Sequence, residues 1–378
     1  MLGVYPLVIR CVIIKEKLSR RASSSKYLRH QAAKRILLII QGGIGDMILS
    51  TPMLCLLRRV YRGAVIDVIT KAKYAGFFEG CPLVNQVIKW PGNSAVFGIL
   101  GPPCQLLESI YRKYDITISC VEHFGGAYRW FTGKAISYLS EAPVRIGTLD
   151  GITRKYPRIA RRFLTQGVEQ RREHEARRML KLLGPLGINN TREPARIWIS
   201  RRDQRELDKI YPLKNASRTR KNLVGVSPFT VLPRQWPYER WSGLIDYLIE
   251  EEKATVVMLG ARQNCDDAVF LVHMCKNKDK IVSLVGKTTL GSLGAVINLL
   301  SLLITHDSGP AHFAAALQVP EIVLFAWANP GRCGPWQNKA SLVIRNPSLR
   351  IADIALAEVC QAARQMLEKG NKRPNLSH

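Results

Sequence analysis

Acidic residues are scarce in this sequence. Its 378 residues include 29 Asp and Glu against 56 Lys and Arg, so the formal net charge is +27. Such a positive surface attracts polyanions or anionic lipid, and nucleic acid, a phosphorylated glycan and a membrane surface all fit it. With 47% hydrophobic and 22% charged residues, the composition is that of a globular chain and excludes a disordered one. The length is ample for two hydrophobic cores.

The sequence also lacks any closely paired cysteines. Its nine cysteines are scattered, without a C-x-x-C pair, so we interpret them as reduced thiols of a cytoplasmic protein. Cys265, His273 and Cys275 lie near one another but do not have the spacing of zinc ligands. We therefore expect no metal site.

A long hydrophobic run is missing as well. The apolar stretch 7–14 is interrupted by Arg10, is too short to span a bilayer, and is followed by a basic stretch, 15–35. No small-residue cleavage site follows it cleanly, which argues against a signal peptide. We interpret residues 1–33 as a basic, poorly ordered leader. An interfacial anchor on anionic lipid is the functional alternative.

From Lys34 onward, short apolar runs alternate with amphipathic stretches, which predicts α/β architecture with parallel, doubly wound sheets. The polar stretch 214–222 separates two such series and predicts two domains, 34–213 and 223–349. A terminal helix over 350–368 is expected to pack back toward the N-terminal domain, and 369–378 forms a tail. The predicted strands are 34–40, 65–70, 87–89, 116–120, 144–147, 223–227, 255–260, 281–284, 299–305 and 322–325.

Two junctions between a predicted strand and a predicted helix stand out. In the second half, the strand ends in Thr305-His306-Asp307-Ser308-Gly309-Pro310, where Asp307 or Ser308 can cap a helix and Pro310 suits its first turn. Free amides and the positive end of the helix dipole would then face a ligand, and a phosphate is the natural guest. In the first half, Gln41-Gly42-Gly43-Ile44-Gly45-Asp46 follows a strand in the same way.

Three other classes of protein can be weighed against these motifs. A dinucleotide-dependent oxidoreductase would need a third glycine where Ile48 stands, and an acidic residue at the end of the second strand, whereas Asp67 lies inside it. A Ser-His-Asp hydrolase would need a strained nucleophile elbow, which is missing around Ser308. The charge suggests a nucleic-acid-binding protein, but no binding module appears and the basic residues are not interleaved with stacking aromatics.

The order and spacing of four segments resemble glycosyltransferase family 9, the heptosyltransferase family of lipopolysaccharide assembly. The resemblance covers about residues 34–368. The segments are Ile36 to Asp46 with Thr51-Pro52, Ser227 to Thr230 with Arg234-Gln235-Trp236-Pro237, Leu284 to Leu290, and Asp307 to His312. The resemblance implies a GT-B fold, in which two Rossmann-like domains face a central cleft that holds the site.

The resemblance also implies an inverting and metal-independent reaction, with a nucleotide sugar as the donor substrate and no cofactor. Its general base is expected at Asp46. A carboxylate there can take the proton of an acceptor hydroxyl as the oxygen attacks the anomeric carbon. The alternative role of Asp46 is to cap the helix that is expected to begin near Met47, and one carboxylate can do both.

For the donor, the resemblance points to residues of the second domain. The amides of Ser308 and Gly309 can stabilise the departing diphosphate, together with Arg234, where the family usually has Lys. Phe229 stands where relatives often have a small or polar residue. The full set of expected donor-binding residues is Thr230, Arg234, Asp266 (with Asp267 as the alternative contact to the ribose), Asp307, Ser308, Gly309 and His312. His312 is expected either to contact the phosphate or sugar or to pack structurally.

Acceptor binding is expected at Gly43 and Gly45 of the first glycine-rich turn and at Arg129 and Arg158. The two arginines belong to a basic region that runs from Arg154 to Arg178, with Arg129 and Lys134 before it. An anionic glycolipid would suit such a region, and a solvated, membrane-facing surface is the alternative. His174 matches a histidine often seen in the family, but its physical role is open. The function expected from the sequence is transfer of a heptose from ADP-heptose to a cell-envelope glycan at the inner membrane surface, with no specific nucleic acid as partner.

Overall fold

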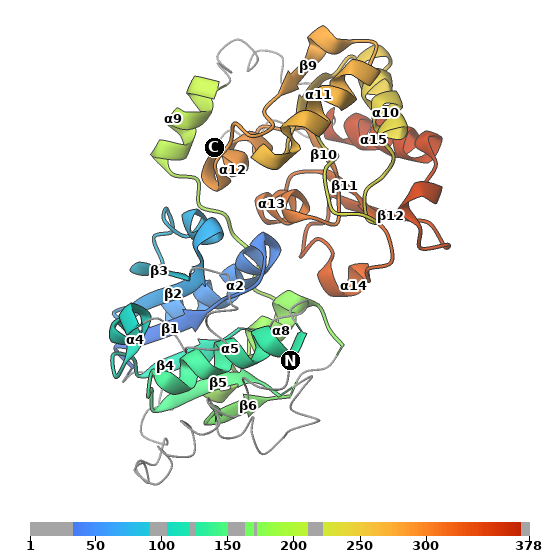
Figure 1. The fold of residues 1–378 in the computed structure, drawn as a ribbon. Coiled ribbons are helices and arrows are strands. Elements are labelled where there is room, and N and C mark those ends of the chain that lie inside the picture. Colours follow the sequence, from blue (N-terminus) through green and yellow to red (C-terminus); the bar gives the residue numbers. More distant parts are fainter. Residues whose placement is uncertain are drawn as a thin grey trace. The chain divides into compact units, whose positions relative to one another are not determined.

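In the computed structural model the chain divides into two units, 1–193 and 194–378, each built on its own parallel sheet (Figure 1). The structure describes residues 33–90, 104–120, 126–149, 163–169, 172–210 and 222–371. The leader 1–33, apart from Ala33, and the end of the tail lie outside these residues. Each unit is described separately.

The first unit holds a six-stranded parallel sheet in the order β3-β2-β1-β4-β5-β6. Its strands are β1 (Arg35–Ile39), β2 (Val65–Lys71), β3 (Gln86–Trp90), β4 (Ile116–Ser119), β5 (Val144–Thr148) and β6 (Gln166–Val168). Its helices are α2 (Ile44–Val60), η2 (Ala72–Phe77), α4 (Cys104–Ile110), α5 (Gly126–Leu139), α8 (Glu175–Lys181) and η3 (Gly184–Leu186).

The second unit repeats this plan with a six-stranded parallel sheet in the order β12-β11-β10-β7-β8-β9. Its strands are β7 (Leu223–Ser227), β8 (Thr255–Met258), β9 (Ile281–Ser283), β10 (Leu302–His306), β11 (Glu321–Phe325) and β12 (Ser341–Arg345). Its helices are α9 (Arg201–Ile210), α10 (Tyr238–Glu250), η5 (Arg262–Asn264), α11 (Cys265–Met274), η6 (Lys278–Lys280), α12 (Leu290–Ile297), α13 (Gly309–Leu317), α14 (Pro330–Cys333), η7 (Ile351–Asp353) and α15 (Leu356–Asn371).

Both sheets have the strand order of a dinucleotide-binding fold. In each sheet the first strand of the unit is central, and the later strands are added first on one side of it and then on the other. The central strands β1, β7 and β10 are apolar along almost their whole length, as expected for strands covered by helices on both faces. The order reverses between β1 and β4 in the first unit and between β7 and β10 in the second. These two switch points are where ligands bind in such sheets.

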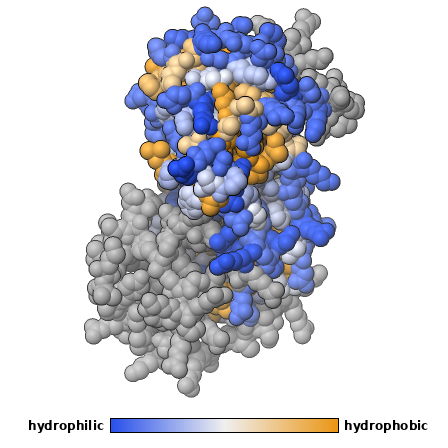
Figure 2. Space-filling view, turned by 90° about the vertical axis from the view of Figure 1, so that its right-hand side faces the viewer, coloured by the Kyte–Doolittle hydropathy of each residue, from blue (hydrophilic) through white to orange (hydrophobic). Residues whose placement is uncertain are grey.

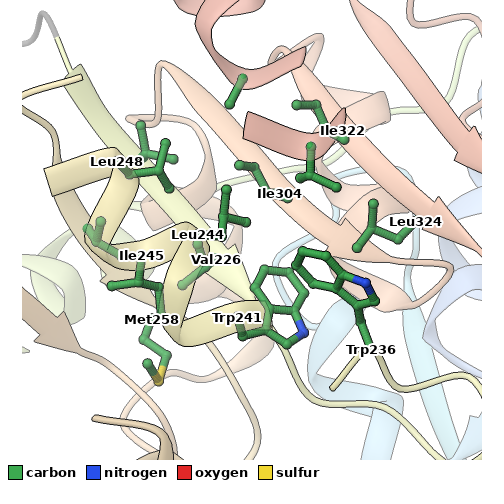
Figure 3. Packing of buried hydrophobic residues seen from close by; sticks show 14 of the residues in the cluster. Val226, Trp236, Trp241, Leu244, Ile245, Leu248, Met258, Ile304, Ile322 and Leu324 are labelled. Carbon is green, nitrogen blue, oxygen red and sulfur yellow. The ribbon is translucent and has the colours of Figure 1, made fainter. Parts of the chain in front are cut away.

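The core of the second unit is organised around two tryptophans. Trp236 and Trp241 are fully buried and meet edge to face at 5.3 Å between ring centroids. They pack with aliphatic residues of α10 and of the central strands, including Ile304 and Leu324 (Figure 3). Trp241 lies in the first turn of α10, and Trp236 lies in the loop before that helix. Because both side chains are buried in the core, the core fixes this loop.

The structure corrects several element predictions. Two short edge strands, β6 and β12, were not expected, and the division between the units falls between Glu193 and Pro194 instead of at 214–222. The reason is that α9 belongs to the second unit, where the Thr289 hydroxyl donates to Glu206 at 2.9 Å and Leu207 is buried. The predicted linker itself, except for Asn222, lies outside the described residues.

The C-terminal helix α15 starts at Leu356, after the separate short helix η7. Its apolar side, with Val359, Ala363 and Leu367, joins the core of the second unit and packs against α10. The buried side of α15 thus lies within its own unit. The expected packing of this helix toward the N-terminal domain stays a prediction.

The surface agrees with the composition. The face drawn in Figure 2 is mostly hydrophilic, with apolar residues gathered in one region over the second unit. No helix among the described residues combines the length and the apolar character that crossing a membrane requires. The seven cysteines whose side chains the structure describes are all free thiols.

Candidate active site

The candidate donor site lies at the switch point of the second sheet. β7 ends at Ser227 and β10 at His306, and the two strands pair in parallel, so the loops that follow them leave the same sheet edge side by side. The loop after β7 carries Thr230 and Arg234, and the turn after β10 carries Asp307. The structure therefore brings together two motifs that are 73 residues apart in sequence.

The turn after β10 leads directly into α13. Ser308 is its N-cap residue and has an extended backbone, and the helix starts at Gly309 with Pro310 in its first turn. The expected cap by a side chain is not formed by Ser308, whose hydroxyl instead lies 3.3 Å from that of Thr305. Because the Ser308 side chain does not cap the first turn of α13, the backbone amides of that turn can bind an anion.

Arg234 supplies the positive charge beside this turn. Its guanidinium lies 3.8 Å from the Asp307 carboxylate and donates to the Asp307 backbone carbonyl at 3.5 Å. The Arg234 side chain is 32% exposed to solvent, whereas the Asp307 side chain is 12% exposed. Arg234 thus remains accessible to a ligand while it is aimed at the start of α13.

Burial makes Asp307 an unusually weak acid. It raises the pKa of the carboxyl to about 6, although Arg234 and the nearby Cys333 thiol act in the opposite direction. Asp307 is therefore a poor acid close to an anion site, and its charge changes just below neutral pH. An ionised Asp307 would repel a diphosphate, whereas the protonated form would not.

The position of Arg234 depends on a buried histidine that was not singled out from the sequence. His306 Nε2 accepts the Trp236 backbone N–H at 2.9 Å, and the His306 ring lies edge on to Trp241, at 5.3 Å between centroids. Burial, followed by the nearby Arg234 charge, lowers the pKa of His306 to about 3, so the ring is neutral. With Nε2 as acceptor, the proton of the neutral ring is on Nδ1.

The other predicted donor residues have different surroundings. Thr230 is partly exposed, and its amide lies 3.5 Å from the Gln235 side-chain carbonyl. His312 is 8% exposed in the first turn of α13. Asp266 is exposed in the first turn of α11, which begins at Cys265. That turn follows β8, the strand beside β7, so Asp266 belongs to the same edge of the sheet but to the next junction.

In the first unit, Asp46 lies at the corresponding switch point, in the first turn of α2. The helix starts at Ile44, earlier than expected, and the Asp46 carboxylate accepts the Gly43 N–H at 2.7 Å. This contact is the capping role weighed above. Gly43 is the N-cap and Gly45 lies in the helix. A Cβ atom on Gly42 would lie 2.0 Å from Asp46 Oδ2, so the carboxylate rests against the Gly42 backbone.

The predicted acceptor region is described only in part. Arg158 lies outside the described residues, and Arg129 lies in α5, where only its backbone is described. Lys134, in the same helix, is 2% exposed with its ammonium 3.4 Å from the Thr148 hydroxyl, so it is not part of a basic surface. His174 receives a physical role, because its Nδ1 accepts the Ala176 N–H and so caps α8.

No group of three or more His, Cys, Asp or Glu side chains within the described ranges is arranged to hold a metal ion. A separate cavity of about 630 Å³ lies in the groove between α10 and α15, and none of the predicted site residues lines it. The candidate chemistry therefore gathers at the two switch points.

Comparison with known proteins agrees with these motifs. The profile of glycosyltransferase family 9 (heptosyltransferase) matches residues 105–352, well over half of the chain. Lipopolysaccharide heptosyltransferase 3 of Escherichia coli K12 is 26% identical over 302 residues, which cover 77% of this chain and 82% of the relative. Lipooligosaccharide heptosyltransferase 2 of Haemophilus influenzae is 24% identical over 315 residues, covering 82% and 88%.

Solved structures show the same architecture. A family 9 glycosyl transferase from Veillonella parvula matches with a TM-score of 0.74 at 23% identity, over 92% of this chain and 100% of that one. E. coli ADP-heptose lps heptosyltransferase II matches with a TM-score of 0.70 at 19% identity, over 89% and 99%. These likenesses, with the two parallel sheets, confirm the expected GT-B fold.

Proposed function

Because the chain belongs to glycosyltransferase family 9 and is a glycosyltransferase, we propose that it transfers a heptose from ADP-heptose to the lipopolysaccharide core or another cell-envelope glycan. Several relatives in this family are named for heptose transfer to lipopolysaccharide or lipooligosaccharide, which supports both the donor and the acceptor class. We place the reaction at the inner face of the cytoplasmic membrane, where the basic surface would meet anionic lipid.

The observation that carries the proposal is the position of Arg234 beside the start of α13. Guanidinium binds phosphate oxygens bidentately, and the first amides of a helix bind anions. Both groups meet at the switch point, where open α/β sheets bind nucleotides. They would hold the diphosphate of the donor and stabilise the negative charge that grows on it as the glycosidic bond breaks.

Asp46 is the proposed general base. The acceptor oxygen attacks the anomeric carbon from the face opposite the diphosphate, the bond from that carbon to the phosphate oxygen breaks, and the acceptor proton passes to the Asp46 carboxylate. The nucleoside diphosphate leaves with the bonding electrons, and the anomeric configuration is inverted. The hydrogen bond from Gly43 holds the carboxylate in place without removing its charge.

The oxidoreductase alternative loses its acidic residue in the structure. Asp67 lies in the middle of β2, is 1% exposed, and accepts the Tyr114 hydroxyl at 2.8 Å and Arg35 at 3.4 Å. A carboxylate that is buried and bonded in this way is not available for the ribose of a dinucleotide. Asp67 is a structural residue of the sheet.

A thermal-shift experiment tests the donor site. The melting temperature of the purified protein is measured with ADP, UDP, GDP and NAD, each with and without EDTA, because a ligand that binds the folded state raises it by mass action. We expect ADP to raise the melting temperature with EDTA present. The Arg234→Ala variant should lose that response.

Arg202→Ala is the matched control. Arg202 is an exposed arginine of the same unit that forms an ion pair with Glu206 one helical turn away. Exposed pairs of this kind contribute little stability. The variant should keep the response to ADP. A response to NAD alone, or no response to any diphosphate, would contradict the proposed donor site.

A further inference from the structure

Trp327 has an environment that the proposed mechanism does not use. Its side chain is 52% exposed, whereas the residues on either side, Ala326 and Ala328, are 3% and 6% exposed. A single exposed apolar side chain is common at a protein surface, so the exposure of Trp327 is informative only through its place beside the candidate donor site. The local backbone directs a large apolar ring away from the core.

The segment around Trp327 is held firmly. Arg345 of β12 donates to the Ala326 carbonyl at 3.1 Å and to the Trp327 carbonyl at 3.3 Å. Ala328 packs in a small buried cluster with Ala311, a residue of the first turn of α13. The ring is thus presented by a fixed backbone, which lowers the entropy cost of ordering it around a ligand.

This segment adjoins the proposed diphosphate site. β10 and β11 pair with His306 opposite Leu324, and the Asp307 amide donates to the Leu324 carbonyl at 3.2 Å. The helix after Trp327, α14, brings the Cys333 thiol to 3.9 Å from the Asp307 carboxylate. Trp327 therefore follows the strand next to the one that carries the phosphate-binding turn.

The strand order indicates which part of the donor meets Trp327. The expected nucleoside contacts, such as Asp266, follow β8, which lies on one side of β7 and β10 in the sheet. Trp327 follows β11, on the other side of β10. A donor whose diphosphate sits at the start of α13 and whose nucleoside extends toward β8 would extend its sugar toward β11.

We propose that Trp327 contacts the transferred sugar of the donor and contributes to its recognition. The flat apolar face of an indole suits the C–H face of a sugar ring, and aromatic side chains contribute large contact areas in ligand sites. This inference rests on the proposed function. It adds a specificity-determining residue to the donor site, one that acts on the sugar and not on the nucleotide.

Binding of two probes, ADP and ADP-heptose, tests the inference by titration calorimetry. Trp327→Ala should weaken ADP-heptose about five-fold, the scale of a single aromatic contact, and leave ADP within about two-fold. Trp327→Phe should recover most of the loss, because it keeps a flat ring. Phe270→Ala, which removes another exposed aromatic side chain of the same unit, should leave both affinities unchanged.

The possible outcomes separate the inference from the function on which it depends. Unchanged ADP-heptose affinity in Trp327→Ala, or an equal loss for ADP and ADP-heptose, would overturn the contact with the sugar while the donor site stands. Failure of the wild-type protein to bind either probe would overturn the proposed function and the inference with it.

Discussion

The Trp236 backbone N–H donates to Nε2 of the buried His306 at 2.9 Å, and this bond ties the loop that carries Arg234 to the strand that precedes Asp307. The bond joins one of the segments that carry the family resemblance, at Trp236, to the residue directly before another, which begins at Asp307. The buried Trp236 indole secures the same loop through a second bond, from its Nε1–H to the Ile354 carbonyl at 3.0 Å. The position of the Arg234 charge is thus set from the core.

Replacing His306 should therefore affect the donor site from a distance. His306→Ala leaves the buried Trp236 N–H without its acceptor and creates a cavity, which together should cost several kcal/mol, on the order of 2–4. We expect a lower melting temperature and weaker ADP binding. His306→Gln, whose side-chain oxygen can accept the same bond, should recover part of both. Wild-type ADP affinity in a folded His306→Ala protein would contradict this account.

The same histidine should make the fold sensitive to acid. Its pKa is about 3 in the folded state against 6.5 for a free side chain, so between these values the unfolded chain binds the extra proton. Its contribution to stability is complete above pH 6.5 and decreases as the pH falls toward 3. Melting temperatures from pH 7 to 4 should therefore fall more steeply in the wild type than in His306→Gln.

Asp307 should give donor binding a pH dependence. Its pKa near 6 means that the carboxyl loses its proton as the pH rises from 5 to 7, and the resulting charge lies beside the diphosphate site. Affinity for ADP-heptose, whose bridging diphosphate does not itself titrate in this range, should decrease over that interval. Asp307→Asn should bind the donor with little change from pH 5 to 7. An equally steep profile in that variant would exclude Asp307 as the cause.

Gly42 should be essential for the position of the general base. A methyl group at this residue would lie 2.0 Å from Asp46 Oδ2 and would have to displace the carboxylate. Gly42→Ala should thus reduce kcat strongly while ADP, bound by the other unit, keeps its affinity. Gly63→Ala, at a glycine with open space around it, is the control. Full turnover in Gly42→Ala would show that the observed position of Asp46 is not required.

Glu321 should make the protein less stable as the pH rises from 4.5 to 8. Burial raises its pKa to about 8, although hydrogen bonds from Ser341 and Asn338 oppose the shift. Between pH 4.5 and 8 the folded state holds a proton that the unfolded chain has released, so stability decreases as the pH rises through this range. Glu321→Gln keeps the hydrogen-bond acceptor without the ionisation. Its melting temperature should decrease less between pH 6 and 9 than that of the wild type.

The central strands were predictable because burial on both faces leaves a continuous apolar run. The edge strands β3 and β9 were predicted, but the edge strands β6 and β12 have no such signature. β6 is three residues long and includes Gly167, and β12 alternates in exposure along Ser341–Arg345. Their strand character comes from pairing with β5 and β11, which local sequence does not reveal.

At the candidate site, the local structure was predictable where a motif carries its own turn geometry, as at Asp46 and at the start of α13. His306 was missed because its role depends on Trp236, which is 70 residues away and reaches it only in the folded sheet. A histidine within a buried strand, directly before the Asp307 turn, was the available signal. The capping role of His174 was missed because histidine is not among the residues that usually cap helices.

The most direct test of the account is the initial rate of ADP release from ADP-heptose with a lipopolysaccharide core acceptor and EDTA, for the wild type and Asp46→Asn. The asparagine oxygen can still accept the Gly43 N–H, so the variant should fold and bind ADP as before. The account predicts acceptor-dependent release by the wild type and a decrease of about 10²- to 10⁴-fold in the variant, the usual contribution of a general base. Release at the wild-type rate by Asp46→Asn, or none by a wild-type protein that binds ADP, would contradict it.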